Sequence, residues 1–84
     1  MIGDPIFLPL MAEIRELVEQ AIAMLGSEAK LARAIGLSQP TINDAKHKGR
    51  VTARLAAGIH KATNGQVSRS ALRPDLWPPE ESAA

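Results

Sequence analysis

Gln39, Asn43 and His47 recur at intervals of four residues, and each carries a side chain that can hydrogen-bond the edge of a nucleic acid base. On a helix, residues four apart lie along one ridge. Glutamine and asparagine amides can bond the adenine edge in the major groove through two hydrogen bonds. Asp44 lies beside the ridge, where it either accepts from a cytosine amino group or repels phosphate. The pattern indicates a helix that reads duplex DNA; the alternative is a solvated polar face on an ordinary helical hairpin.

Two short helices joined by a tight turn must hold this ridge, and the spacing of apolar residues predicts them at 28–35 and 39–48. The apolar stripe of the first helix consists of Leu31, Ala32 and Ile35. Ser27 can cap this helix, because its hydroxyl can accept an N–H of the first turn. Gly36 can end the helix, because glycine adopts a left-handed conformation at little cost.

The second helix is predicted to begin after Ser38, a second capping residue, with Pro40 in the first turn, where a missing N–H costs nothing. Ile42 and Ala45 then point inward three residues apart. A small residue at the helix crossing, a glycine at the bend and a branched residue in the second helix are together typical of a helix-turn-helix.

The formal net charge of +1 conceals an uneven distribution along the 84 residues. Between residues 28 and 61, seven basic side chains are opposed by two acidic ones, so this segment carries +5. The remainder has three basic and seven acidic side chains and carries −4. A basic region around the ridge is expected of a DNA-binding face, although a solvated surface with no partner could have the same charges.

The composition excludes several other classes of protein. With no cysteine, disulfides and thiolate metal sites are ruled out. His47 and His60 belong to no H-E-x-x-H pattern and to no Ser-His-Asp order, so we expect no catalytic residue, no metal, no cofactor and no enzyme activity. No apolar run approaches the roughly twenty residues of a membrane span, and the opening segment lacks the basic start of a secretory signal. We therefore expect no membrane partner and a cytoplasmic protein, associated with the nucleoid when bound to DNA.

Further helices are expected around the central pair. Amphipathic patterns predict helices at about 10–25 and 53–63, and Ser68 can cap one more turn through Leu72. Gly58 inside a helix indicates close packing against another helix, either of this chain or of a second subunit. The fold class is therefore predicted as all-α, a compact bundle of four to five helices.

The chain is expected to form one small domain at 11–77, preceded by an arm and followed by a tail. Residues 1–10 contain two prolines and an apolar run, and form either a loose N-terminal arm or one that docks on a partner. Residues 78–84 are read as a C-terminal tail. Trp77 is expected to cover the core or to join a subunit contact, in preference to stacking on a base. So small a core favours dimerisation as an added source of stability.

Two stretches carry a resemblance to a known family. Residues 29–43 read AKLARAIGLSQPTIN, and residues 61–78 read KATNGQVSRSALRPDLWP. Together they resemble Cro-like helix-turn-helix regulators of phages and mobile elements, particularly the YdaS-like antitoxin branch. The resemblance covers about residues 21–79, and the L-R-P-D-L-W-P ending is its more specific part. It implies a helical bundle that binds operator DNA, often as a dimer, and represses transcription.

Carried onto this sequence, the resemblance places the recognition helix at about Gln39 to Lys48. It implies base contacts from Gln39, Pro40, Asn43, Asp44 and His47. From charge and position, we expect contacts with the DNA backbone from Lys30, Ser38, Thr41, Lys46, Lys48, Arg50 and Arg54. Two subunits would place their recognition helices about 34 Å apart on a near-palindromic operator.

The chain departs from the family pattern in two places. Its first ten residues are extra, and it differs at a position behind the recognition helix. Its relatives usually carry an aromatic residue there, where this chain has Ala45 followed by Lys46 and His47. Less volume then lies behind the helix, so another residue must fill the space. This departure and the modest net charge leave a second function open. In it, the chain is an antitoxin or antiactivator that holds a protein partner with the same fold and the apolar arm.

Overall fold

The computed structural model describes residues 8–78, with side chains from residue 13 onward. This part of the chain forms, in order, α1 (Leu8–Leu25), α2 (Glu28–Ile35), α3 (Gln39–Lys48), α4 (Ala53–Ala62) and α5 (Arg69–Leu72). It contains no strand, so the prediction of an all-α bundle is confirmed. None of these described helices is long and apolar enough to cross a membrane.

The first helix begins earlier than predicted. We expected it to start near residue 10, whereas α1 starts at Leu8. Pro9 does not prevent this, because the first turn of a helix needs no donor from its N–H. The N-terminal arm predicted at 1–10 therefore overlaps the helix at 8–10, and residues 1–7 lie outside the described part of the chain. The tail predicted at 78–84 is described only at Pro78.

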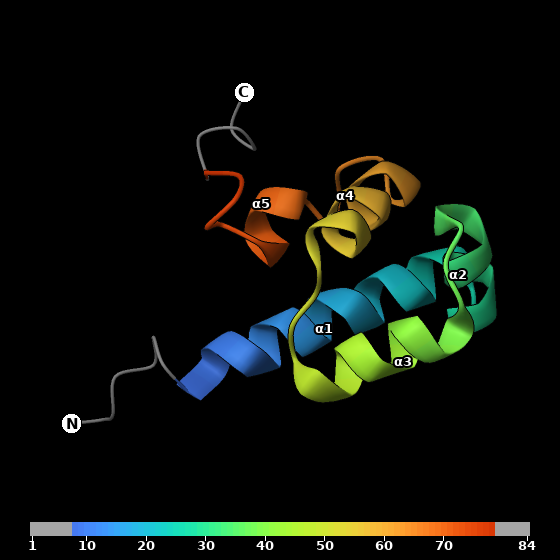
Figure 1. Ribbon diagram of the computed structural model, residues 1–84, viewed down its shortest axis with the longest axis horizontal. Coiled ribbons are helices and arrows are strands. Elements are labelled where there is room, and N and C mark those ends of the chain that lie inside the picture. Colours follow the sequence, from blue (N-terminus) through green and yellow to red (C-terminus); the bar gives the residue numbers. More distant parts are fainter. Residues whose placement is uncertain (1–7, 79–84) are drawn as a thin grey trace.

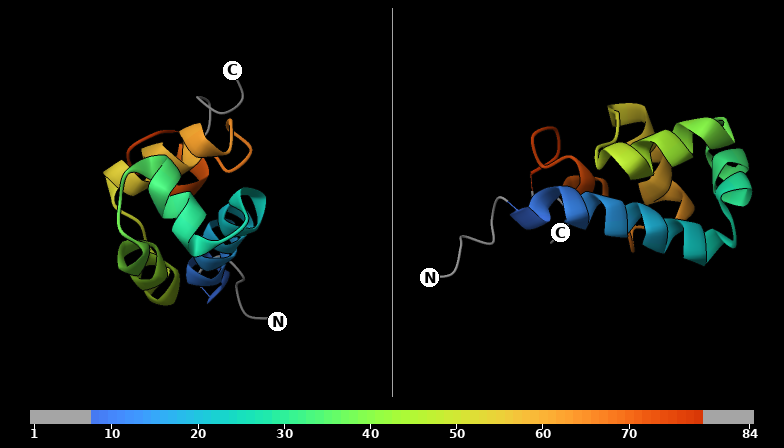
Figure 2. Two further views of the ribbon diagram at one scale, coloured as in Figure 1. Left: turned by 90° about the vertical axis from the view of Figure 1, so that its right-hand side faces the viewer. Right: turned by 90° about the horizontal axis from the view of Figure 1, so that it is seen from below.

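The helices pack around α1, which is the longest of them. α3 returns alongside α1 in the opposite direction, and α2 joins their neighbouring ends (Figure 1). α4 packs against α2 and α1, while α5 packs against α4 and α1. Figure 2 shows the same arrangement from two other sides. α2 thus contacts α1, α3 and α4, whereas α3 contacts α1 and α2.

One apolar core joins the five helices. Leu31 and Ile42 are fully buried, and each such side chain contributes about 1.5–3 kcal/mol relative to an exposed one. Trp77 packs against the core from the C-terminal segment, as predicted for a residue that covers it. The buried apolar set is Ile14, Val18, Ala21, Leu31, Ala32, Ile42, Ala45, Val51, Leu55, Ala56, Ile59, Val67 and Leu72.

Gly58 marks a close approach between α2 and α4. A Cβ atom at this position would run into the Ile35 side chain, at Cγ2, Cγ1 and Cβ. Ile35 is branched at Cβ and cannot easily rotate away. The prediction of close packing at Gly58 is confirmed, and the neighbouring helix belongs to the same chain.

The two N-caps of the helix pair differ. Ser27 caps α2 as predicted, since its Oγ accepts from the Lys30 N–H at 3.1 Å. The prediction for Ser38 was wrong in its hydrogen bond, because its side chain makes no cap bond to α3. Pro40 removes one of the N–H groups that a cap would accept, and the Thr41 N–H bonds the Ser38 carbonyl at 3.1 Å. The Ser38 hydroxyl instead pairs with that of Thr41 at 2.8 Å.

Candidate nucleic-acid interface

The third helix buries one side and exposes the other. Ile42 is fully buried and Ala45 nearly so, which directs the opposite side of α3 to solvent. With 3.6 residues per turn, Pro40 and His47 lie near the middle of the outward side. Both residues are exposed. α3 therefore offers a convex helical face that no described segment covers.

The side of α3 next to α2 holds the two amides of the predicted ridge. Gln39 is exposed and Asn43 is half-buried. Both donate to the carboxylate of Glu28, at 3.4 Å from Gln39 Nε2 and 3.3 Å from Asn43 Nδ2. Together with Pro40, these residues line a hollow on the surface. Neither amide is turned into the core, but each has a partner for its nitrogen.

Glu28 is a residue of this face that the sequence analysis did not select. Its Oε2 also lies 2.8 Å from Lys46 Nζ, in an ion pair whose side chains are 16% and 23% exposed. Hydrogen bonds from Lys46, and then from Asn43, lower the pKa of the Glu28 carboxyl below its ordinary value. No spacing rule could reveal this cluster, because Glu28 lies on a different helix from its three partners.

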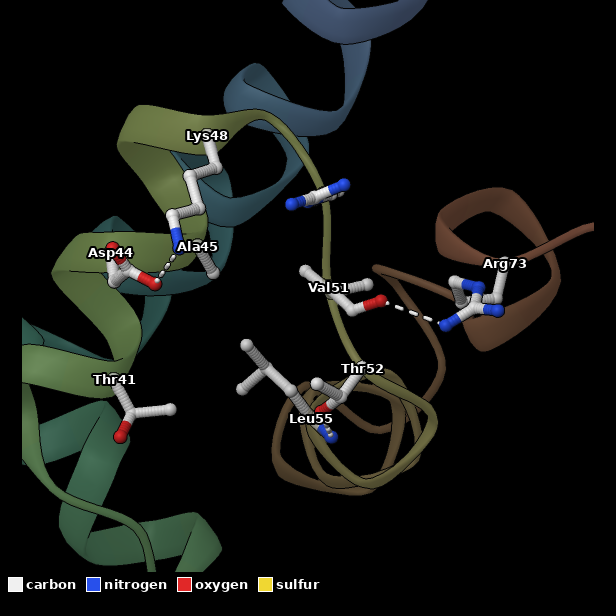
Figure 3. Close-up of a pocket in the computed structure, with 9 residues that line it drawn as sticks. Thr41, Asp44, Ala45, Lys48, Val51, Thr52, Leu55 and Arg73 are labelled. Atoms are coloured by element: carbon white, nitrogen blue, oxygen red, sulfur yellow. Dashed lines mark hydrogen bonds and ion pairs between the residues drawn. The ribbon is translucent and has the colours of Figure 1, made fainter.

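The opposite side of α3 borders a hollow of about 400 Å³ at the start of α4 (Figure 3). Thr41, Asp44 and Lys48 line it from α3, and Thr52 lines it from the N-cap of α4. Lys48 Nζ lies 3.1 Å from Asp44 Oδ2, and both side chains are more than half exposed. Such exposed pairs stabilise little, so the lysine can exchange partners readily.

The basic residues predicted to contact DNA phosphates are not all gathered in one place. The side chain of Arg50 lines the hollow beside Lys48 and makes no hydrogen bond or ion pair within the described residues. Arg54 is exposed in the first turn of α4 but does not line the hollow. Lys30 lies over Gly26 in the turn between α1 and α2. Lys46 is withdrawn to Glu28. Of these cations, Lys48 and Arg50 are thus the two that line the hollow beside α3.

An arginine of α1 holds the C-terminal end of α3. Arg15 donates from Nε to the Lys46 carbonyl at 3.1 Å and from Nη2 to the His47 carbonyl at 3.3 Å. These are orphan acceptors of the last helical turn, and a cation is favoured there by the helix dipole. Arg15 therefore helps to set the position of α3 against α1, in a chain where the small Ala45 is the buried residue of that turn.

A second arginine fixes the loop that follows α3. Arg73 Nη1 donates to the Val51 carbonyl at 3.0 Å (Figure 3). Its Nε and Nη2 donate to the two carboxylate oxygens of Asp75, at 3.0 and 2.7 Å. This bidentate pair lowers the pKa of the Asp75 carboxyl. The R-P-D sequence thereby connects the C-terminal segment to the loop between α3 and α4.

The groups on this face can recognise a ligand through hydrogen bonds and charge. Its accessible groups are amides, an imidazole, two hydroxyls and several cations, arranged on a helix and at its borders. Within the described residues, no group of three or more histidine, aspartate or glutamate side chains could hold a metal ion.

Comparison with known proteins identifies the family. The family model described as "Bacterial toxin YdaS" matches residues 18–80. A protein of Escherichia coli (strain K12) named "Putative transcriptional regulator YdaS" is 36% identical over 59 residues, which are 69% of this chain. The chain spans about 60% of the length of that curated relative. No solved structure matches significantly. The family model covers most of the chain and includes α2, α3 and the R-P-D segment, and the chain therefore belongs to the YdaS family.

Proposed function

We propose that this protein is a sequence-specific DNA-binding regulator of transcription, of the Cro type, that inserts α3 into the major groove. The observation that carries the proposal is the exposed outward side of α3, with His47 near its middle, two amides on the side next to α2 and cations at its other border. A helix of this size fits the major groove of B-form DNA, where every base pair presents a distinct pattern of donors and acceptors. The name of the E. coli relative supports a regulatory function and gives no support to an enzyme.

The residues divide by the part of the duplex that they would contact. Bases would be read by Gln39, Pro40, Asn43, Asp44 and His47. Phosphates would be bound by Lys30, Ser38, Thr41, Lys48, Arg50 and Arg54. Lys46, which the sequence also predicted to bind phosphate, is paired with Glu28 in the free protein. The phosphate contacts set position and register, whereas the base contacts select sequence. Asp44 would accept from a cytosine amino group once Lys48 turns to a phosphate.

The functional unit would be a homodimer that represses transcription in the cytoplasm from a near-palindromic operator. Two copies of α3 must then lie about 34 Å apart, one helical turn of DNA, to reach successive major grooves. The stoichiometry of the complex in a gel shift, measured on full and half sites, tests this arrangement.

Selection of bound sequences from random duplexes is the direct test of the proposal. We expect a recurrent motif, and binding to it should weaken steeply from low to moderate salt. Asn43→Ala should cost roughly 1–3 kcal/mol on the selected site and little on random DNA. Arg50→Ala is the matched phosphate variant, and should weaken both and reduce the salt slope by about one.

Absence of binding at low salt would overturn the proposal. That result would favour the second function drawn from the sequence, an antitoxin or antiactivator that holds a protein partner. Equal losses for Asn43→Ala on selected and random DNA would instead remove Asn43 from the set of base-reading residues.

A further inference from the structure

Glu28 is the acidic centre of a cluster that spans the two helices of the motif. Lys46 Nζ donates to its carboxylate at 2.8 Å, Asn43 Nδ2 at 3.3 Å to Oε2 and Gln39 Nε2 at 3.4 Å to Oε1. The lysine bond is short and charge-assisted, while the two amide bonds are long and individually weaker. Glu28 thus meets residues at the start, the middle and the last turn of α3.

A carboxylate accepts hydrogen bonds and cannot donate them when ionised. Each amide must therefore turn its nitrogen toward Glu28, which leaves its carbonyl oxygen on the other side. This orientation limits what Gln39 and Asn43 can offer to a ligand. Carbonyl oxygens accept from the amino groups of adenine or cytosine, and the remaining N–H of each amide can complete a bidentate contact with adenine.

The same carboxylate changes the charge of the face. The Lys46 side chain is about three-quarters buried, and its ammonium group is engaged by Glu28 at 2.8 Å. The neutralised lysine adds nothing to general attraction for DNA.

We propose that Glu28 is a positioning residue that raises base selectivity and lowers general affinity for DNA, by fixing both amides of the reading face and by holding Lys46 away from phosphates. This inference rests on the proposed DNA-binding function. A purely structural role would require Glu28 for folding alone and would leave selectivity and salt dependence unchanged.

The first arm of the test uses Glu28→Gln, with Glu19→Gln on the exposed side of α1 as a control of equal charge change. Dissociation constants are measured on the selected duplex and on a scrambled one, over a series of salt concentrations. Glu28→Gln should bind scrambled DNA several-fold more tightly and reduce the specificity ratio by about fivefold or more. Its salt slope should become steeper by about one, because Lys46 is released. Glu19→Gln should change the specificity ratio and the slope little.

The second arm asks where Lys46 points when DNA is bound. Lys46→Gln alone should leave the salt slope unchanged, whereas Lys46→Gln in the Glu28→Gln background should flatten it by about one. The single variant keeps Glu28 and its hydrogen bonds from Gln39 and Asn43, so this arm remains informative if Glu28→Gln folds poorly. A flattened slope in the single variant would overturn the proposal, because Lys46 would then already contact phosphate.

A third arm needs no DNA and separates this inference from the proposed function. In the free protein, the side-chain NH₂ signals of Asn43 and Gln39 should shift in NMR spectra as Glu28 is titrated with acid, and should lose that shift in Glu28→Gln. Signals that do not follow the titration would overturn the fixing of the amides. If the amides do follow it and the wild-type chain selects no DNA sequence, the proposed function fails while the cluster stands.

Discussion

Glu28 illustrates how one side chain can have two consequences that are separable by experiment. As the first residue of α2 it is favoured by the helix dipole, and as the partner of three α3 residues it connects the helices of the motif. The sequence indicates the first effect, since position and charge suffice. The second depends on α3 lying across the start of α2, which local spacing does not specify.

Acid should weaken the fold partly through Glu28. Its pKa is lowered in the folded chain, so its contribution is complete above the unfolded value of about 4.3 and is lost as pH falls through the folded value. We expect the free energy of unfolding, from urea titrations at pH 7, 5, 4 and 3, to decrease over this range. Glu28→Gln should show a smaller decrease. Because the pKa of Asp75 is also lowered, Asp75→Asn should likewise show a smaller decrease than the wild type, and the double variant should show the smallest decrease.

At the scale of the helices, local rules succeed where the determining residues are neighbours. The predicted ranges 28–35 and 39–48 coincide with α2 and α3, because caps, a left-handed glycine and apolar spacing all lie within a few residues of each boundary. Gly36 has φ 86°, and Asn64 and Gly65 are also left-handed after α4. The start of α1 was missed by two residues, because a proline in a first turn gives no firm boundary.

The two serines that precede α2 and α3 should differ when replaced by alanine. Ser27→Ala should lower the free energy of unfolding by roughly 0.5–2 kcal/mol, because the Lys30 N–H loses its acceptor. Ser38→Ala should cost less, since its hydroxyl makes no cap bond. Urea unfolding of both variants, followed by circular dichroism, makes the comparison. Equal losses would mean that Ser38 caps α3 in solution.

Adding a methyl group at Gly58 should disturb the close packing of α4 against α2. An alanine normally stabilises a helix by about 1 kcal/mol relative to glycine. Gly58→Ala should instead destabilise by roughly 1–3 kcal/mol, because its Cβ would overlap Ile35. In an Ile35→Ala background the same change should become neutral or stabilising. Unfolding measurements on the four chains form a double-mutant cycle, and additive effects would contradict the overlap.

At the scale of the whole molecule, the candidate site is assembled by contacts between distant segments. Arg15 of α1 bonds the last carbonyls of α3, and Arg73 after α5 bonds the loop that follows α3. The sequence shows that both residues are charged. Their acceptors are backbone carbonyls, which every residue has, so the sequence does not reveal these partners. The fold class was therefore predictable, as was the general location of the face, whereas the partners of Glu28, Arg15 and Arg73 were not.

Replacing Arg73 should destabilise the protein more than replacing its ion-pair partner Asp75. Arg73→Gln removes a charged donor from the Val51 carbonyl and should lower the free energy of unfolding by roughly 1.5–3 kcal/mol. Asp75→Asn keeps that bond and weakens only an exposed pair, so the loss should be below about 1 kcal/mol at pH 7. Chemical unfolding of the two variants checks the order. The reverse order would place the stabilising contact at Asp75.

α3 is tethered along its length, by Glu28 at the amide side chains and by Arg15 at the terminal carbonyls. A recognition helix held in this way loses little conformational entropy when it binds. It also adjusts little to a duplex whose shape does not fit it. If the domain binds DNA as proposed, any mismatch of curvature has to be absorbed by the duplex. Easily kinked pyrimidine–purine steps between the half-sites would then be preferred, at base pairs that no side chain touches.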